Sequence, residues 1–375
     1  MKIARIHAQP LLVPAEVNFA GFRSTHNMSI CLVEVETEDG LKGYGITAIT
    51  DARVAAAAVN QVLAPALKGL DPLRHESVWE RMYWLLSPRG QTGFASHAMA
   101  AVDTALWDIK GKALGQPVWR LLGGARERVQ VYTTFGFPGF DREQLTEAAL
   151  HWVGQGHRRL KMVVGHQGLQ QRDRGATLMD TIREDARRVR AVREAVGPEV
   201  ELYIDANCCL DLAHATQLAK WVSDCDIAFF EEPITQNDVA QMAELRRRTG
   251  MAVAAGQNEG LLFRFRDMIQ AGAVDFVQPN TVIGGGYTQC LKIAAYADAH
   301  NLPVVNGGAW TFHNMHLQAG VSNGTMVEYH HFAVVACGSF FPGLPTPQDG
   351  WLQLPDQPGL GFEPDLQAAR QFACA

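Results

Sequence analysis

Three side chains with oxygen atoms recur at an even spacing in the middle of the chain. Asp205 ends the apolar run Leu-Tyr-Ile-Asp, Glu231 ends Ala-Phe-Phe-Glu, and Gln257 follows Ala-Val-Ala-Ala-Gly. Both intervals are 26 residues (231 − 205 and 257 − 231). A strand with its return helix and two loops takes about that length, so we predict that the three residues end successive strands of a parallel barrel. Their oxygens would then converge at one rim, and oxygen ligands suit a hard divalent cation such as Mg²⁺.

The alternation of strands and helices continues on both sides of these residues. Helical spacing of apolar residues covers, for example, 185–196 and 288–299. The predicted strands number eight, as a closed barrel requires. Their ends fall at Thr133, Lys161, Asp205, Glu231, Gln257, Asn280, Asn306 and Glu328. The sequence therefore predicts an α/β fold with a TIM-like barrel over residues 126–339.

Residues 1–125 have a different pattern and are predicted to form an α+β module before the barrel. Alternating residues over 30–37 and 41–45 flank an Asp-Gly turn, which is typical of a hairpin. Helical spacing follows over 52–68 and 94–114. The tail over 340–375 is rich in Pro and Gly, and we expect it to pack back on this module.

Composition excludes several classes of protein. The net charge is −6, and no cluster of Lys and Arg indicates a nucleic-acid partner. The seven cysteines form no CxxC pair, so neither a zinc site nor a disulfide framework is expected. We therefore expect a cytoplasmic location. No apolar stretch reaches the 18 or so residues that a membrane span needs, so no membrane contact is expected.

A set of motifs resembles the enolase superfamily, specifically its mandelate racemase subgroup, over nearly the whole chain. The motifs are Ala101-Val-Asp-Thr-Ala-Leu-Trp-Asp-Ile-Lys-Gly111, Lys161-Met-Val163, Tyr203-Ile-Asp-Ala-Asn207, Glu231-Glu-Pro233, Gly256-Gln-Asn-Glu259, Val277-Gln-Pro-Asn280 with Gly284-Gly-Gly286, and Val327-Glu328. The resemblance implies a modified (β/α)7β barrel under an N-terminal capping domain. It implies one Mg²⁺ per subunit, with Mn²⁺ as a substitute, and a homo-oligomer of two to eight subunits. It also implies chemistry that begins by removing a proton α to a carboxylate, where a metal stabilises the enediolate.

The chain departs from the family pattern at the metal site. Asp205 and Glu231 match the family's ligands, but Gln257 stands where most members have Glu. An amide oxygen binds Mg²⁺ without contributing charge, so the metal would be held more weakly unless Glu259 or Asn207 assists. We therefore take Gln257 as the third ligand and Glu259 as a further candidate.

The usual acid/base groups are also replaced. Val163 stands where the family has the second lysine of Lys-x-Lys, and Asn280 and Asn306 stand where it has an Asp-His dyad. Lys161 remains, either as the base or as a cation that holds the substrate carboxylate.

A second source of an acid/base group is the segment after the seventh strand. If it opens a helix, His313 and His316 lie on one face, and one of the two would replace the dyad. Which one serves is left open. Glu328 matches the family's eighth-strand carboxylate and would hydrogen-bond the substrate carboxylate, in protonated form.

Substrate contacts are expected from the capping domain and from the rim of the barrel. The segment 17–27 is predicted to be a mobile loop that closes over the site, with Arg23, His26 and Asn27 facing the substrate and a surface salt bridge as the alternative for Arg23. At the rim, the predicted contacts are His166, Asn207, Asn280 and Asn306. His330 and His331, after Glu328, are interpreted as rim residues only.

The function that these residues favour is dehydration of a sugar acid to a 2-keto-3-deoxy acid. One effective acid/base side is enough for that reaction, whereas racemisation needs two opposed bases. The alternatives are a racemase or epimerase of a 2-hydroxy or amino acid derivative, which would use Lys161 and a histidine, and a non-catalytic barrel that binds metal and ligand. The glycines at 284–286 form no GxGxxG motif, so a nucleotide cofactor is not expected.

Overall fold

The computed structural model describes residues 1–19, 21–88, 91–175 and 177–374. Its N-terminal part is an antiparallel sheet in the order β1 (Ile3–Phe19), β2 (Phe22–Thr37), β3 (Lys42–Ala48). The predicted hairpin around the Asp-Gly turn is the pair β2 and β3. The helical elements that follow are α1 (Ala52–Ala57), η1 (Ala58–Leu63), α2 (Ala64–Leu67), α3 (His75–Leu86), α4 (Phe94–Leu114) and α5 (Val118–Leu121).

Helix α4 packs directly on the N-terminal sheet because β3 carries glycine where the two elements cross. A Cβ atom at Gly45 would lie 2.2 Å from the backbone oxygen of Ala101, so the helix approaches closer than any side chain permits. The other side of the module contacts the second part of the chain through polar groups. The indole of Trp107 donates to Thr288 Oγ1 (2.9 Å), and Thr288 in turn bonds Asp103. These contacts fix the module against the start of α11 (Gly286–Asp298).

The second part of the chain is built on a parallel sheet. Its strands are β4 (Arg128–Gly136), β5 (Arg159–Val163), β6 (Glu201–Asp205), β7 (Ile227–Glu231), β8 (Val253–Ala255), β9 (Phe276–Val277) and β10 (Met326–His330). They are hydrogen-bonded in the order β10–β4–β5–β6–β7–β8–β9. Between β9 and β10, Val304 forms parallel bridges to Val277 and Gly324. The prediction of an α/β fold with a parallel sheet and a small N-terminal domain is confirmed.

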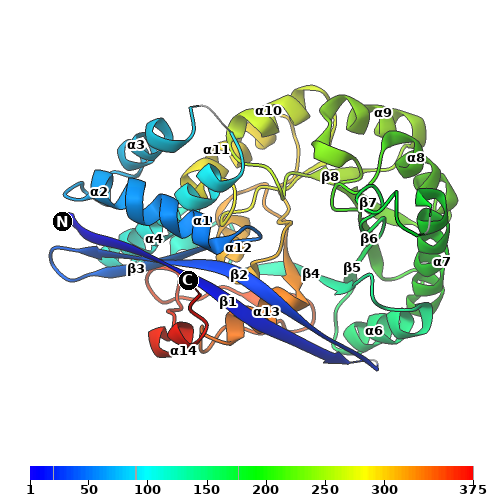
Figure 1. Ribbon diagram of the computed structural model, residues 1–375, viewed down its shortest axis with the longest axis horizontal. Coiled ribbons are helices and arrows are strands. Elements are labelled where there is room, and N and C mark those ends of the chain that lie inside the picture. Colours follow the sequence, from blue (N-terminus) through cyan, green and yellow to red (C-terminus); the bar gives the residue numbers. More distant parts are fainter. Residues whose placement is uncertain (20, 89–90, 176, 375) are drawn as a thin grey trace.

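Helices cover the outside of this sheet, and Figure 1 shows α7 to α11 as an arc around β5 to β8. The elements are α6 (Arg142–Gly154), α7 (Leu178–Val196), α8 (Leu212–Trp221), η2 (Thr235–Asn237), α9 (Val239–Thr249), α10 (Leu262–Gln270), α11, α12 (Thr311–Gly320) and α13 (His331–Gly338). Across the described residues, no helix is both long and apolar enough to span a membrane.

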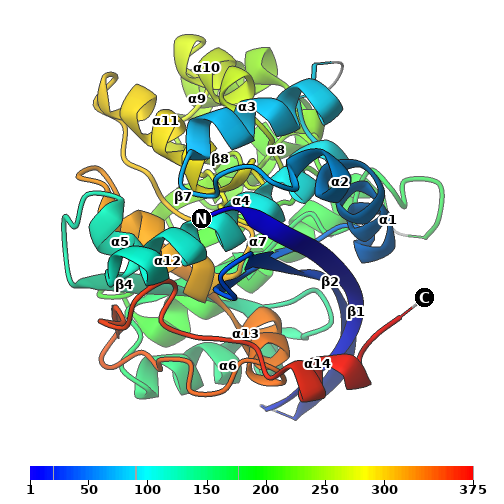
Figure 2. The same ribbon diagram turned by 90° about the vertical axis from the view of Figure 1, so that its left-hand side faces the viewer.

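The C-terminal tail contacts both parts of the molecule. Strand β11 (Trp351–Gln353) pairs antiparallel with β4, at the end of that strand away from the site. Farther along, α14 (Leu366–Gln371) leads the chain to β1, where Leu12 N donates to Phe372 O (2.9 Å). Figure 2 shows α14 beside β1.

The prediction of an irregular loop over 17–27 is wrong. Strands β1 and β2 stay paired to their ends, from Val17 with Ser24 to Phe19 with Phe22. The polar residues of this segment therefore lie on a regular two-stranded ribbon, in which successive side chains point to opposite faces. Ala20 lies outside the described residues.

Candidate active site

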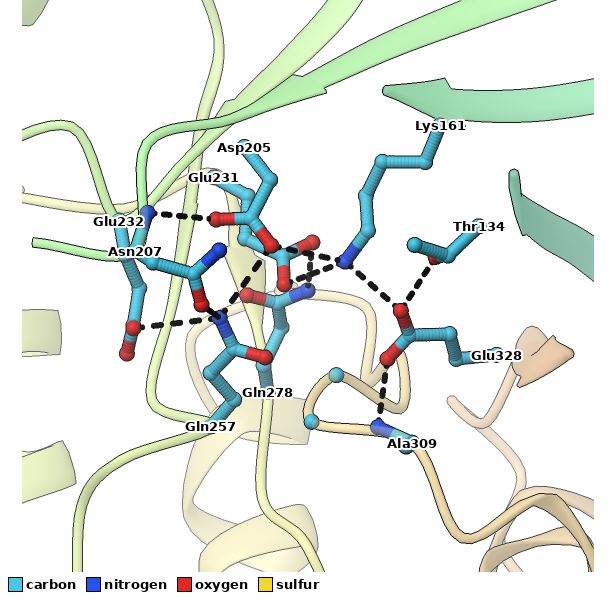
Figure 3. Close-up of polar contacts among 12 residues, drawn as sticks. Thr134, Lys161, Asp205, Asn207, Glu231, Glu232, Gln257, Gln278, Ala309 and Glu328 are labelled. Atoms are coloured by element: carbon cyan, nitrogen blue, oxygen red, sulfur yellow. Dashed lines mark hydrogen bonds and ion pairs between the residues drawn. The ribbon is translucent and has the colours of Figure 1, made fainter. Parts of the chain in front are cut away.

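The centre of the site is one buried lysine surrounded by three carboxylates (Figure 3). Lys161 Nζ lies 2.6 Å from Glu231 Oε1, 3.0 Å from Glu328 Oε1 and 3.1 Å from Asp205 Oδ2. The lysine side chain is 0% exposed, and the carboxylates are 5% exposed or less. We refer to these four residues as the lysine–carboxylate cluster.

Strand alternation explains why these four side chains meet. Asp205 and Glu231 end the neighbouring strands β6 and β7 and pair in register. Lys161 lies inside β5 and Glu328 inside β10, on the strands that flank β4. Beneath them an apolar layer that includes Tyr132, Tyr203 and Phe229 fills the interior of the sheet. The cluster therefore rests on a packed floor, at the level where the strands end.

The charges within the cluster do not balance. Burial lowers the pKa of Lys161, but the negative charges of Glu231, Glu328 and Asp205 outweigh burial and hold that pKa above its usual value. Burial and the neighbouring Asp205 raise the pKa of Glu231. Three carboxyl groups facing one ammonium group crowd more negative charge into a site closed to solvent than the lysine compensates. This excess is the charge that a divalent cation would neutralise.

Glu328 is held as an acceptor. Burial raises the pKa of Glu328, but the charge of Lys161 and the hydrogen bonds from Thr134 and from the backbone N–H of Ala309 lower it by more. The pKa of Glu328 is therefore below its usual value. Ala309 N donates to Oε2 at 2.6 Å, and the Thr134 hydroxyl donates to Oε1. All these partners are donors, so the structure favours the ionised carboxylate over the protonated form that we expected.

Gln257 lies beside the cluster and directs its amide nitrogen toward carboxylates. Nε2 is 3.4 Å from Asp205 Oδ2 and 3.2 Å from Glu232 Oε2. Glu232 is itself buried and accepts hydrogen bonds from Asn237 and Asn258. Gln257 is therefore positioned by a second carboxylate that sequence reasoning did not single out.

Glu259 is not brought to the cluster. Its carboxylate accepts from Arg264 Nε (2.9 Å) and from Asn237 Nδ2 (3.2 Å). The extended conformation needed to keep Glu259 on the face of Gln257 ends at β8, and Glu259 N closes a turn onto Gly256 O (3.0 Å). The negative charge of Glu259 is therefore paired with Arg264 and does not face the cluster, where a metal ligand would lie.

The donor set nevertheless fits Mg²⁺. Asp205 and Glu231 present two converging carboxylate oxygens, both within 3.1 Å of the same Nζ atom. Gln257 supplies a neutral amide as the third group, and hard oxygen donors are the ligands that Mg²⁺ takes. The uncompensated charge of the cluster supports the same conclusion.

A cavity of about 690 Å³ lies above the cluster and below the β1–β2 ribbon. Its lining includes Val163, Asn207 and His330. Each of these lies two residues after a member of the cluster (Lys161, Asp205 and Glu328). Val163 and His330 share a strand with Lys161 and Glu328, and side chains two apart on a strand share a face, whereas Asn207 follows the end of β6. The cavity therefore sits one layer nearer the rim than the charged groups.

The predicted substrate contacts from the capping domain divide by strand alternation. His26 lines the cavity together with Phe22 and Ser24. Arg23 lies on the other face, where its guanidinium pairs with Glu16 and is 72% exposed. Asn27 is exposed and shares the face of Arg23. The structure thus brings His26 to the cavity and turns Arg23 and Asn27 away.

At the rim, His166 and Asn207 line the cavity, whereas Asn280 and Asn306 are used inside the protein. Asn280 Nδ2 donates to Gly307 O (2.7 Å) and Gly308 O (2.9 Å), and its Oδ1 accepts from Val282 N (3.1 Å). Asn306 Oδ1 accepts from Glu328 N (3.0 Å). Both asparagines are buried and hold the backbone of neighbouring strand ends.

His313 and His316 lie away from both the cluster and the cavity. Helix α12 does begin at Thr311, and the two histidines share a face, but that face packs on the C-terminal tail. The His313 ring lies 5.1 Å from that of Phe362, and His316 Nε2 lies 3.0 Å from Leu360 O. Periodicity predicted the shared face correctly; it could not say whether that face meets the barrel mouth or the tail.

Three residues of the site escaped sequence reasoning as functional groups. Gln278 donates through Nε2 to Glu231 Oε2 (2.9 Å), and Glu232 holds Gln257. His330, interpreted above as a rim residue only, lines the cavity. A signal existed for His330, since it follows Glu328 by two residues and must share its face.

Comparison with known proteins shows the family to which the chain belongs. Residues 3–123 match the N-terminal domain of the mandelate racemase/muconate lactonizing enzyme family. Residues 144–369, more than half of the chain, match the enolase C-terminal domain-like family. The chain belongs to the mandelate racemase/muconate lactonizing enzyme family of the enolase superfamily.

Members of this family that resemble the chain differ in the reaction they perform. The chain is 32% identical over 360 residues to a 3,6-anhydro-alpha-L-galactonate cycloisomerase of Streptomyces coelicolor, covering 93% of this chain and 94% of that one. It is 32% identical over 352 residues to an L-rhamnonate dehydratase of Saccharopolyspora erythraea, covering 91% and 85%. A crystal structure of a racemase from Streptomyces coelicolor with bound magnesium superposes with a TM-score of 0.89 at 28% identity, covering 99% and 100%.

The environment of His313 predicts a pH-dependent effect on stability without an effect on activity. Burial lowers its pKa from 6.5 to about 3, and neither ring nitrogen has a hydrogen-bond partner among the described residues. Between those two pH values the unfolded chain binds a proton that the folded chain does not, so stability falls as the pH falls from 6.5 toward 3. His313→Phe removes this contribution and should flatten that fall by up to about 1.4 kcal/mol per pH unit.

The measurement is urea unfolding of both proteins at several pH values below and above 6.5. The exposed His300 is the matched control, and His300→Phe should leave the slope unchanged. A loss of turnover in His313→Phe at pH 7, with the protein folded, would contradict the placement of His313 outside the site.

Proposed function

We propose that this protein is a Mg²⁺-dependent dehydratase of a sugar acid, an aldonate or an aldarate, that forms a 2-keto-3-deoxy acid. The observation that carries the proposal is the lysine–carboxylate cluster directly beneath a cavity of about 690 Å³. That volume is within the range of small-molecule sites. The relatives that act on sugar acids support the same substrate class.

The cluster supports removal of a proton α to a carboxylate. Bound Mg²⁺ would act as a Lewis acid on the substrate carboxylate, with Asp205, Glu231 and Gln257 as the residues that hold it. Lys161 supplies a fixed positive charge. Three carboxylates lie within 3.1 Å of its ammonium group, and this geometry favours the electrostatic role over the role of a base.

The position of the titratable groups favours dehydration over racemisation. Among the described residues that line the cavity, the histidines are His26, His166 and His330. His166 follows β5 and His330 ends β10, the two strands that flank β4, whereas His26 comes from β2 of the β1–β2 ribbon. The ends of the segments after β8, after β9 and beside β10 carry Gln257, Asn280 and Asn306 instead. Acid/base groups on one side suffice for dehydration, whereas racemisation needs them on two faces.

A second candidate is a barrel that binds a sugar acid without turning it over. The observation that favours it is the neutral side chain at four positions where the family has ionisable groups: Val163, Gln257, Asn280 and Asn306. A homo-oligomeric state and a cytoplasmic location stay predictions from the sequence and do not distinguish the two candidates.

The decisive experiment is a turnover screen of purified protein loaded with Mg²⁺. The panel contains aldonic and aldaric acids, including L-rhamnonate, arabinonate and D-galactonate, and semicarbazide detects 2-keto products. We expect one acid to give a keto product, and we expect Asp205→Asn to abolish that product because it removes a charged metal ligand. No product from any acid, together with a rise in melting temperature on addition of one of them, would favour the non-catalytic barrel.

Gln257 predicts how the metal site responds to charge. Gln257→Glu adds a carboxylate beside Asp205 and Glu232, so the variant should melt at a lower temperature than the wild type in EDTA. In Mg²⁺ the added ligand charge should raise the affinity for the metal at least about tenfold. Calorimetric titration of both proteins with MgCl₂ measures this change. Equal affinities would show that residue 257 does not contact the metal.

A further inference from the structure

We propose that His330 is the acid/base residue of this site, acting on a bound sugar acid from the end of β10. The proposal rests on the proposed function, because it assigns a role within that reaction. It starts from the layer of residues between the cluster and the cavity. Val163, Asn207 and His330 form this layer, one step nearer the rim than Lys161, Asp205 and Glu328. Of the three, only His330 can accept and return a proton.

The sheet places His330 on the side of the site where the family's second lysine is missing. In register, His330 is paired with Thr134 on β4, and Thr134 is paired with Lys161 on β5. His330 and Val163 both line the cavity, so they approach it from strands separated only by β4. Because Val163 is apolar, β5 presents no basic side chain to this side of the cavity. His330 on β10, two strands away, presents an imidazole there.

The surroundings of His330 suit a neutral imidazole that works on a ligand. The ring lies 5.3 Å from Phe137 and 6.3 Å from Phe332, and Nδ1 is buried without a hydrogen-bond partner among the described residues. Burial lowers the pKa of His330, while the negative charge of Glu328 opposes that effect. The imidazole is thus free to accept a proton, and Glu328 stabilises the imidazolium that results.

Other basic groups are less well placed. Lys161 is closed off from the cavity by its ion pairs, and His313 and His316 face the tail. His166 is exposed on the segment after β5, and it also lines a neighbouring cavity of about 420 Å³ next to Arg188. His26 lies on the ribbon above, with its ring 4.3 Å from Phe332. Both lie outside the strands of the parallel sheet, whereas His330 ends β10.

The proton balance closes within the reaction. The His330 imidazole takes the α proton, and the electron pair of the C–H bond moves into the carboxylate to form the enediolate. That electron pair then returns to form the double bond between the α and β carbons, and the bond between the β carbon and its hydroxyl oxygen breaks, with its electron pair staying on oxygen. The imidazolium gives its proton to the departing oxygen, which leaves as water. The enol that remains tautomerises to the 2-keto-3-deoxy acid, and His330 ends the cycle neutral.

The test compares variants on the acid that the turnover screen identifies. His330→Asn and His330→Gln should lower kcat at least about a hundredfold. Exchange of the α proton in D₂O, measured by proton NMR, should fall by the same factor, with KM within about threefold. Adding imidazole to His330→Ala should restore part of kcat, which a purely structural role would not allow. His300→Asn, at an exposed position, is the matched control and should behave as the wild type.

The outcomes separate this proposal from the function on which it rests. If the wild type turns over an acid and both His330 variants keep kcat within tenfold, His330 is not the acid/base residue, and the dehydratase function stands. Loss of kcat in His166→Asn alone would move the role to His166. Loss of kcat in folded His330 variants without rescue by imidazole would also overturn the proposal. If the wild type turns over no acid, the proposed function fails, and this assignment fails with it.

Discussion

The structure depends on how one buried ammonium group is compensated. Lys161 Nζ is enclosed by carboxylate oxygens of Asp205, Glu231 and Glu328 at distances of 2.6–3.1 Å. None of these side chains is more than 5% exposed, so the carboxylates, and not solvent, compensate the charge of the ammonium group. Desolvating four ionised groups is costly unless they are paired with good geometry. The four strands that carry them must therefore end at one level, with the apolar layer around Tyr132 packed beneath. Because the carboxylates outnumber the lysine, the same arrangement leaves a place for a divalent cation.

The layers above the cluster follow from this constraint. Strand alternation that turns the charged residues inward also turns the residues two positions later toward the cavity, and the β1–β2 ribbon covers them. Asn280 and Asn306, which stand where an Asp-His dyad is expected from the resemblance, tie strand ends together. The titratable side chains that remain at the strand ends lie next to β4: His166 follows β5, and His330 lies two residues after Glu328 on β10.

Sequence reasoning reached the parts of the site that local patterns determine. The even spacing of Asp205 and Glu231 placed them on neighbouring strands, and the structure pairs these strands in register. Choices set by tertiary packing were out of reach. Periodicity could not show that the face of α12 carrying His313 meets the tail, nor that residues 17–27 extend two paired strands. Glu259 was weighed as a ligand because nothing in the local pattern shows its ion pair with Arg264.

The measurement that tests the central claim most directly is a double-mutant cycle between Lys161 and Glu231, on the free energy of unfolding in EDTA. Each single change, Lys161→Met or Glu231→Gln, alters a buried charge pair, and removal of one partner of such a pair typically costs about 3–5 kcal/mol. The account predicts that the double variant is less destabilised than the sum of the two by about 1–3 kcal/mol. Costs that add to within about 0.5 kcal/mol would show that the two groups do not interact, and would contradict the cluster as the organising feature of the site.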